Sequence, residues 1–283
     1  MNNNILEIKN LNTTIGDFSL KNINFSIEKG TITGFIGKNG SGKTTLIKTM
    51  LDLFPRESGK VLFWGKDMYE NEIEVKSNIG VVFDDFSYSQ NQKAINLVKM
   101  ICPFYSNFDI KKFESLANTF NLNLNKKLYE YSKGMQMKFS IAMALCHEAK
   151  LLILDEPTSG LDPVSRSELL NIFYDIIQDE EKSIFFSTHI TSDLDKIADY
   201  IVMIDNGEIV FSKAKDELLE NYALVHMDKQ FLTPEIKNYF VGLKETSFSY
   251  EGIIYDRSKI KLIPNAKVTR PTLEDIMIYR GDL

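Results

Sequence analysis

The chain has 283 residues, of which 43% are hydrophobic and 25% are charged, and its net charge is −6 at pH 7. These values are typical of a globular protein with one large domain, or with one domain and a small appendage. The acidic balance argues against nucleic acid as a main partner. No run of about 18 apolar residues occurs in the sequence, so we expect another chain to supply any membrane-spanning part.

Cysteine usage and the N-terminus indicate a protein of a reducing compartment. Cys102 and Cys146 lie far apart without metal-ligand spacing around them, so we interpret them as packed thiols. The first ten residues, MNNNILEIKN, have no long apolar core, and we therefore expect no signal peptide.

Strand and helix signals alternate along most of the chain. Apolar–polar alternation and short apolar runs predict strands at residues 5–11, 20–27, 31–36, 60–64, 78–83, 151–154, 183–187, 200–204 and 209–211. Helical periodicity predicts helices at 45–53, 94–102, 110–121, 134–147, 163–178 and 191–199. Strands that alternate with helices predict an α/β fold with a mostly parallel sheet covered on both faces.

The distribution of these signals predicts two regions. Helical signals dominate at about 88–148, which we interpret as a helical insert within a first domain at 1–213. After that domain the pattern weakens, and residues 214–283 mix short helix and strand signals. We therefore predict a small C-terminal accessory region at 214–283.

The most specific motif is a glycine-rich loop, Gly-Lys-Asn-Gly-Ser-Gly-Lys-Thr at residues 37–44, between a predicted strand and a predicted helix. It matches G-x-x-x-x-G-K-[ST], in which glycines let backbone N–H groups point at phosphate oxygens. The helix dipole and the lysine favour the phosphates, and the threonine hydroxyl suits Mg²⁺. The alternative is a chance glycine-rich turn. The residues predicted to bind nucleotide here are Gly37, Asn39, Gly40, Ser41, Gly42, Lys43, Thr44 and Thr45.

A second motif is an apolar strand that ends in two acids, Leu-Leu-Ile-Leu-Asp-Glu at residues 151–156. Ligands of open α/β sheets lie at the strand ends. We therefore predict that Asp155 reaches Mg²⁺, together with Thr44, and that Glu156 acts as general base on a water at the γ-phosphate. The alternative is a strand that ends in a solvated acidic turn.

With the loop, three further segments resemble the ATP-binding-cassette (ABC) ATPases: Tyr-Ser-Lys-Gly-Met-Gln at 131–136, Leu-Asp-Glu-Pro-Thr-Ser-Gly-Leu-Asp at 154–162, and Ser-Thr-His at 187–189. Their order and spacing match the family over roughly the first 215 residues. The resemblance implies a P-loop NTPase cassette: a RecA-like, mostly parallel sheet, an antiparallel β-subdomain and the helical insert, followed here by a small α+β appendage. It also implies ATP and Mg²⁺ as cofactors.

The resemblance assigns roles to four more residues. Ser132 and Gly134 lie in the segment that, in the family, binds the γ-phosphate of ATP held by a partner subunit, Asp162 resembles the aspartate that crosses the dimer interface, and His189 resembles the histidine that contacts the γ-phosphate. Each also has a plain structural alternative: Ser132 and Asp162 suit helix caps, and a histidine after a strand is usually structural. The resemblance implies Lys43, Glu156 and His189 as the catalytic residues.

The chain departs from the family pattern at three places. The usual Leu-Ser-Gly-Gly-Gln is Tyr-Ser-Lys-Gly-Met here, so Lys133 adds a charge. Asp84 stands where a glutamine that reaches Mg²⁺ is usual, and we retain it as a predicted metal ligand. Ile15 stands where an aromatic residue usually stacks on adenine; the alternatives are weak base stacking and substitution by the nearby Phe18, which we retain as a predicted nucleotide-binding residue.

Further resemblance indicates one branch of bacterial export ATPases, which includes exporters of antibiotic and cytolytic peptides of the phenol-soluble-modulin type. It rests on Phe-Tyr-Ser-Asn-Phe-Asp at 104–109 and Arg-Pro-Thr-Leu-Glu-Asp-Ile at 270–276; the alternative for these aromatic residues is local packing. This implies a peripheral protein at the cytoplasmic face of the membrane, with a transmembrane permease and a second ATPase subunit, identical or related, as partners.

Two other functions compete with this interpretation. A soluble ABC ATPase that acts on DNA or the ribosome usually has two cassettes, long coiled coils or zinc-binding cysteines, and this sequence shows none of them. An inactive regulatory cassette is disfavoured because Lys43 and Glu156 are both present.

Overall fold

The computed structural model describes residues 3–105 and 107–280. Contacts within the chain divide it into two units, Met1–His189 with Val202–Ser212 and Ile190–Ile201 with Lys213–Leu283. This division differs from the predicted boundary in residues 190–201, which include helix α7 (Thr191–Ile197). They belong to the second unit because α7 packs against helix α10 (Leu273–Arg280).

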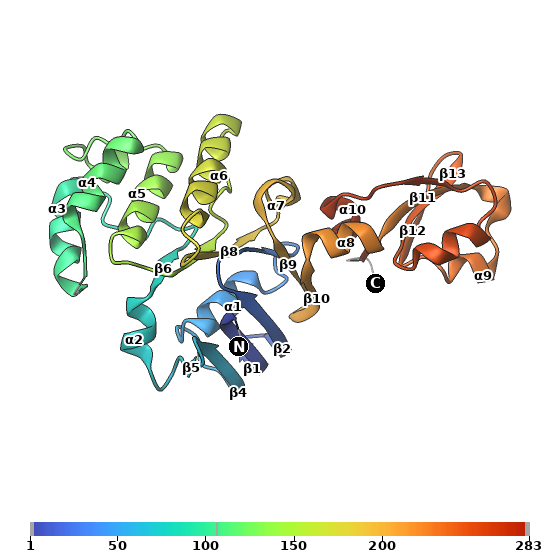
Figure 1. Cartoon of the computed structure of the whole chain (residues 1–283), viewed down its shortest axis with the longest axis horizontal. Coiled ribbons are helices and arrows are strands. Elements are labelled where there is room, and N and C mark those ends of the chain that lie inside the picture. Colours follow the sequence, from blue (N-terminus) through green and yellow to red (C-terminus); the bar gives the residue numbers. More distant parts are fainter. Residues whose placement is uncertain (1–2, 106, 281–283) are drawn as a thin grey trace. The chain divides into compact units, whose positions relative to one another are not determined.

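Between residues 4 and 214, most helices and strands follow the order that the periodicity predicts (Figure 1). The short strand at 66–67 and the short helix at 72–77 are not predicted by the periodicity. The strands are β1 (Asn4–Ile15), β2 (Phe18–Glu28), β3 (Ile32–Ile36), β4 (Ser58–Phe63), β5 (Lys66–Asp67), β6 (Ile79–Val82), β7 (Leu151–Asp155), β8 (Ser183–Thr188), β9 (Tyr200–Asp205) and β10 (Glu208–Ala214). The helices before α7 are α1 (Lys43–Met50), α2 (Glu72–Ser77), α3 (Ala94–Ile101), α4 (Ile110–Thr119), α5 (Lys133–Leu145) and α6 (Pro163–Ile177).

Two sheets form the first unit. The larger has the strand order β10-β9-β3-β8-β7-β6, and its central pairs β3–β8, β8–β7 and β7–β6 are parallel. The smaller has the order β2-β1-β4-β5 and is antiparallel throughout. Strands β3, β7 and β8 are buried along their whole length, as expected of a sheet covered on both faces. The predicted mixed architecture, a mostly parallel sheet with an antiparallel β-subdomain, is confirmed.

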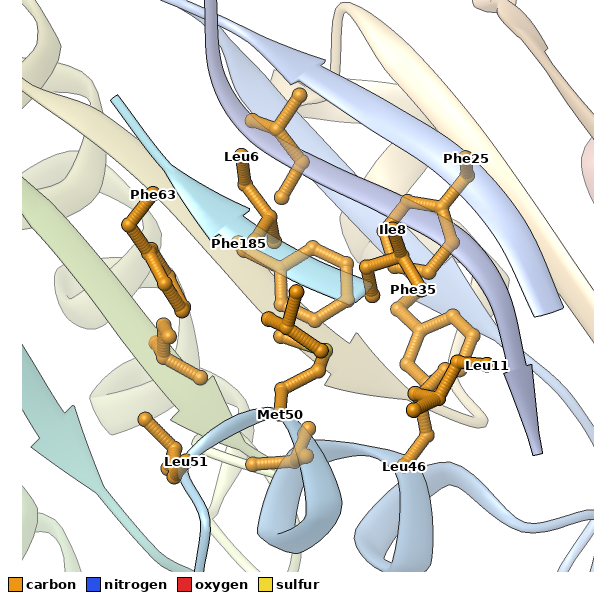
Figure 2. Packing of buried hydrophobic residues seen from close by; sticks show 14 of the residues in the cluster. Leu6, Ile8, Leu11, Phe25, Phe35, Leu46, Met50, Leu51, Phe63 and Phe185 are labelled. Carbon is orange, nitrogen blue, oxygen red and sulfur yellow. The ribbon is translucent and has the colours of Figure 1, made fainter. Parts of the chain in front are cut away.

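The core between these sheets holds helix α1 in place. Figure 2 shows Leu46 and Met50 of α1 pointing into a cluster of apolar side chains from the two sheets. Within the cluster, the rings of Phe35 and Phe185 stack with centroids 5.3 Å apart, and Phe25 stacks on Phe185 at 5.8 Å. Close-packed cores have low compressibility, so this packing holds α1, and with it the loop before α1, against the main sheet.

The helical insert connects β6 to β7 through α3, α4 and α5 (Figure 1). Its core is aromatic: the ring of Phe139 on α5 meets those of Phe86, Tyr88, Phe113 and Tyr131 edge-on at 5.6–6.4 Å. Burial raises the pKa of Tyr88 to about 12. The segment that follows β6 is therefore packed against α5. Short 3-10 turns at Cys102–Phe104 and Leu128–Glu130 complete the insert.

The second unit contains a separate small sheet with the order β12-β13-β11-β14. Its apolar cluster includes Val225, Met227 and Ile254. The elements after β10 are α8 (Lys215–Asn221), β11 (Ala223–Asp228), α9 (Pro234–Lys237), β12 (Gly242–Glu245), β13 (Ser249–Ile254), β14 (Lys267–Thr269) and α10, with 3-10 turns at Lys229–Phe231 and Arg257–Leu262. Within the described ranges, no helix of either unit is long and apolar enough to cross a membrane.

Candidate nucleotide site

The glycine-rich loop joins the end of β3 to the start of α1. Gly40 and Gly42 adopt left-handed φ angles of 81° and 108°, which side chains disfavour. A Cβ at Gly37 would lie 2.4 Å from Oγ of Ser41 and 2.5 Å from a carbonyl oxygen of β9. Gly42 precedes α1 without a side-chain cap, so the first N–H groups of the helix are available to an anion.

Lys43 is the buried cation of this loop. Its amine donates hydrogen bonds to the carbonyl oxygens of Gly37 (2.8 Å) and Lys38 (3.3 Å). It also lies 3.2 Å from Oε1 of Glu156. The lysine and the glutamate, predicted separately from two motifs, are therefore brought together at one end of the sheet.

Asp155, the last residue of β7, holds two hydroxyl groups. Its Oδ2 accepts a hydrogen bond from Thr44 (2.8 Å) and its Oδ1 one from Ser187 on β8 (2.6 Å). A carboxylate beside a hydroxyl supplies the oxygen ligands that Mg²⁺ prefers. Among the described residues no group of three or more His, Cys, Asp or Glu side chains could hold a metal.

Glu156 connects three other groups. Its φ is 50°, a strained conformation for this residue type, and its backbone N–H donates to the hydroxyl of Ser187 (2.9 Å). Its Oε2 lies 2.8 Å from Nδ1 of His189. The carboxylate therefore lies between the amine of Lys43 and the ring of His189, and its role as a general base stays a prediction.

One buried atom of the loop supports a phosphate ligand. In the described part of the chain, Oγ of Ser41 is buried without a hydrogen-bond partner, which is costly for a hydroxyl. Ser41 follows two exposed loop residues, Asn39 and Gly40, whereas Thr45 is half-buried in the first turn of α1. The loop thus combines free helix N–H groups, an unsatisfied hydroxyl and a lysine, and this donor set fits a nucleotide phosphate chain.

Phe18 lies beside the loop. A Cβ at Gly42 would be 2.7 Å from Cζ of this ring, so the half-buried ring packs against the end of the loop. Gly207, between β9 and β10, donates its N–H to the carbonyl of Ser41 (3.1 Å). Ile15, at the end of β1, is also half-buried. The role of Phe18 in adenine stacking stays a prediction.

The segments that the resemblance assigns to a partner's nucleotide begin two helices. Ser132 caps α5 by accepting from the N–H of Met135 (3.3 Å). Asp162 caps α6 by accepting from the N–H groups of Val164 (3.0 Å) and Ser165 (3.1 Å). Hydrogen bonds from Ser165 hold the pKa of Asp162 below its usual value. Both predicted capping roles are thus present in the structure.

Gly134 lies close to the start of α6. A Cβ at Gly134 would lie 3.3 Å from the side chain of Ser165, so the starts of α5 and α6 adjoin.

The segment at 270–276 caps a helix. Thr272 and Asp275 form a reciprocal cap at the start of α10: the threonine N–H donates to Oδ2 of the aspartate (2.8 Å), and the aspartate N–H donates to the threonine hydroxyl (3.1 Å).

Asp84 pairs with a lysine, whereas the other two predicted metal ligands pair with each other. Its Oδ1 lies 3.0 Å from the amine of Lys133, whereas Thr44 and Asp155 contact each other. Sequence reasoning missed this pair. It also missed Ser187, whose hydroxyl joins the two acids; the only available signal was its position at the end of an apolar strand.

Parallel strands, a glycine-rich loop before a helix and an acid pair on the neighbouring strand end define a P-loop nucleoside triphosphatase. The comparisons narrow this class. The sequence model of the ABC transporter family matches residues 20–159. The chain is 32% identical over 214 residues to the lantibiotic transport ATP-binding protein SrtF of Streptococcus pyogenes, covering 75% of this chain and 92% of SrtF.

Solved structures agree with this result. The subunit cbiO1 of Clostridium perfringens, part of the ABC transporter complex cbiONQ, is 25% identical, with a TM-score of 0.67 over 77% of this chain and 91% of that chain. The dimeric ATP-binding cassette MJ0796, bound to ADP and Pi, shares the fold at 22% identity, with a TM-score of 0.65 over 74% and 98% of the two chains. The chain belongs to the ABC transporter ATP-binding proteins, and it is the subunit that binds and hydrolyses ATP for transport.

Proposed function

We propose that two such ATPase subunits, identical or related, close on two ATP molecules and thereby drive a separate permease that exports amphipathic peptides or antibiotics. The arrangement that carries the catalytic part is the contact of Glu156 with both Lys43 and His189, at 3.2 Å and 2.8 Å. When ATP binds, the amine of Lys43 moves to the phosphates, and Glu156 becomes free to take a proton from the attacking water.

The remaining side chains position this reaction. Asp155 and Thr44 would hold Mg²⁺, which neutralises charge on the phosphate oxygens when it is bound. His189 orients the carboxylate of Glu156 and contacts the γ-phosphate. Ser132 and Gly134, together with Asp162, act in the site of the opposite subunit. Within their own chain, Ser132 and Asp162 cap the helices that begin there.

Glu156→Gln is the direct test of the catalytic proposal. The variant retains shape and hydrogen bonding but not basicity, so we expect hydrolysis to fall by about 10²–10⁴-fold while ATP binding persists. Glu114→Gln, an exposed acid on α4, is the matched control and should keep the wild-type rate. Equal, appreciable rates for wild type and Glu156→Gln would remove this residue from the mechanism.

A groove beside the helical insert suits the permease. It has a volume of about 780 Å³ and lies among α2, the 3-10 turn after α3 and the end of α5. Two apolar side chains on its rim are highly exposed, Ile73 (88%) and Phe104 (85%). His147 at its base donates from Nε2 to the carbonyl of Ile79 (3.0 Å), and its buried Nδ1 has no partner among the described residues. Such a surface suits an amphipathic helix with a polar donor.

Substitution of the rim tests this docking surface. Ile73→Glu and Phe104→Glu should reduce recovery of the permease with the subunit from detergent-solubilised membranes, because each places a charge in an apolar contact. The ATPase rate of the isolated subunit should stay unchanged. Phe248→Glu, at a site that is 91% exposed in the second unit, is the matched control. Recovery of the chain with ribosomes or DNA, and not with membranes, would support the competing soluble function.

The cargo and the location are inferred from relatives. SrtF is by name a lantibiotic transport protein, and this supports an amphipathic peptide as cargo and the cytoplasmic face of a bacterial membrane as the place of work. A strain that lacks the gene should retain such peptides inside the cell, as measured by mass spectrometry of cells and medium. Unchanged release by that strain would exclude this class of cargo.

A further inference from the structure

The two charged departures from the family pattern meet each other in space. Lys133, the extra cation at the start of α5, and Asp84, the acid in place of a glutamine after β6, lie 49 positions apart in sequence. Their side chains form an ion pair of 3.0 Å. A cation and an acid that occur together and pair with each other indicate one functional unit.

The lysine side chain is held on two sides. Asp84 binds its amine, and a Cβ at Gly160 would lie 3.3 Å from the same nitrogen and 3.6 Å from Cδ of the lysine. Gly160 belongs to the loop that leads to Asp162 and α6. Lys133 therefore touches both the segment after β6 and the loop before α6, next to the serine that caps its own helix.

The segment that carries Asp84 is packed against the aromatic core of the helical insert. Two residues further along, Phe86 packs against Phe139 of α5, with ring centroids 6.4 Å apart, and Tyr88 does so at 5.6 Å. Removal of the aspartate charge should therefore leave the segment where it is. The effect of such a change on Lys133 is then electrostatic.

The pair is weak enough to be exchanged. Both side chains are 43% exposed, and ion pairs at that exposure contribute about 0–1 kcal/mol. A nucleotide phosphate offers the lysine several charged oxygens and a stronger charge-assisted hydrogen bond. An ammonium can thus leave a half-exposed carboxylate for a phosphate at little cost.

We propose that Lys133 binds the terminal phosphate of the ATP held by the opposite subunit, and that Asp84 masks this lysine in the free subunit. The inference rests on the proposed head-to-tail closure, which brings the start of α5 to the partner's nucleotide. Asp84 is then a positioning residue that opposes closure, and Lys133 is an additional phosphate ligand that favours it.

The test compares Asp84→Asn with Lys133→Met in the full-length chain, with Mg²⁺ and ATP as the probe. Loss of the mask should lower the ATP concentration for half-maximal hydrolysis and dimer formation by about fivefold, whereas loss of the lysine should raise it by about fivefold. Lys133→Met combined with Asp84→Asn should behave like Lys133→Met alone, and Lys133→Arg should retain the wild-type value. Both shifts in the required ATP concentration should disappear near 1 M salt, because the screening length is then about 3 Å.

Two neighbouring residues give matched controls. Asp85→Asn removes the same charge one position away, and Lys126→Met removes an exposed lysine of the same insert; both should match the wild type. If Asp84→Asn and Lys133→Met shifted the required ATP concentration in the same direction, the ion pair would have a purely structural role, and the proposal would be overturned. If Asp84→Asn alone raised the ATP concentration for half-maximal hydrolysis, Asp84 would have a direct role at Mg²⁺, and the proposal would be overturned as well. Wild-type protein that neither binds nor hydrolyses ATP would instead refute the proposed function on which the inference rests.

Discussion

At the scale of single residues, the catalytic end of the sheet depends on one hydroxyl. Ser187 donates to Asp155 and accepts from the backbone of Glu156, at 2.6 Å and 2.9 Å. It therefore supports the left-handed backbone of the proposed base as well as the proposed metal ligand. The register of β7 and β8 places Asp155 directly beside Ser187, which explains why a serine at this position can serve both acids.

Ser187→Ala should lower both stability and turnover. Loss of a buried hydroxyl partner costs about 1–3 kcal/mol in the free energy of unfolding, and displacement of Glu156 should reduce kcat at least about tenfold. Ser183→Ala is the control on the same strand, because Ser183 accepts from the backbone of Gly30 (2.9 Å) far from the acids. Denaturant unfolding should show similar losses of stability in both variants, whereas ATPase assays should show a loss of kcat in Ser187→Ala alone. An equal loss of kcat in both would contradict a local role for Ser187.

At the scale of elements, an ion pair fixes the β4–β5 hairpin. Arg56, just before β4, binds Asp67 of β5 through two hydrogen bonds of 2.5 Å and 3.2 Å, and both side chains are largely buried. Burial disfavours the charged carboxylate, but hydrogen bonds from Arg56 and the N–H of Tyr69 outweigh it, so the pKa of Asp67 is lowered. The pair therefore contributes stability above the unfolded pKa of about 3.9, and that contribution is lost as pH falls through the folded pKa.

Asp67→Asn should reveal this dependence. At pH 7 the variant should lose about 1–3 kcal/mol of unfolding free energy, because charged hydrogen bonds to Arg56 are removed. The difference from the wild type should shrink steadily below about pH 4. Denaturant unfolding at several pH values measures it, with Asp17→Asn, an exposed acid between β1 and β2, as the control. A difference that is independent of pH would show that the charge of Asp67 contributes nothing.

Most elements of the first unit are predictable from sequence, because each depends on local patterns. The buried strand β7 begins with four aliphatic residues in a row, and the loop at 37–44 needs its glycines whatever the rest of the chain does. The pair of Lys133 with Asp84 is different. It depends on how α5 packs against the segment after β6, and the sequence of neither segment indicates that it contacts the other.

At the scale of the whole molecule, the nucleotide site lies entirely in the first unit. Its loop, both acids and His189 fall within Met1–His189, whereas the second unit has a sheet and an apolar cluster of its own. A ligand stabilises only the part of a protein whose folded form binds it, by about 2.7 kcal/mol at a hundredfold excess over Kd. ATP should therefore act unequally on the two units.

Hydrogen exchange with and without MgATP tests this difference. We expect added protection at 37–44 and at the ends of β7 and β8, and little change in β11 and β13. Lys43→Ala should abolish the added protection, because it removes the cation that neutralises the phosphates. Equal protection of both units would show that nucleotide also orders the second unit, which would contradict a site confined to the first.

The sequence by itself determined the α/β class, the phosphate loop, the acid pair and the family, because these are contiguous patterns whose chemistry does not depend on distant residues. Only the tertiary structure decided which groups meet: Ser187 with both acids, Lys133 with Asp84, and α7 with α10 in the second unit. Such contacts follow from strand register and helix packing between segments far apart in the chain. They are set by the burial of shared apolar surface, which no single segment specifies.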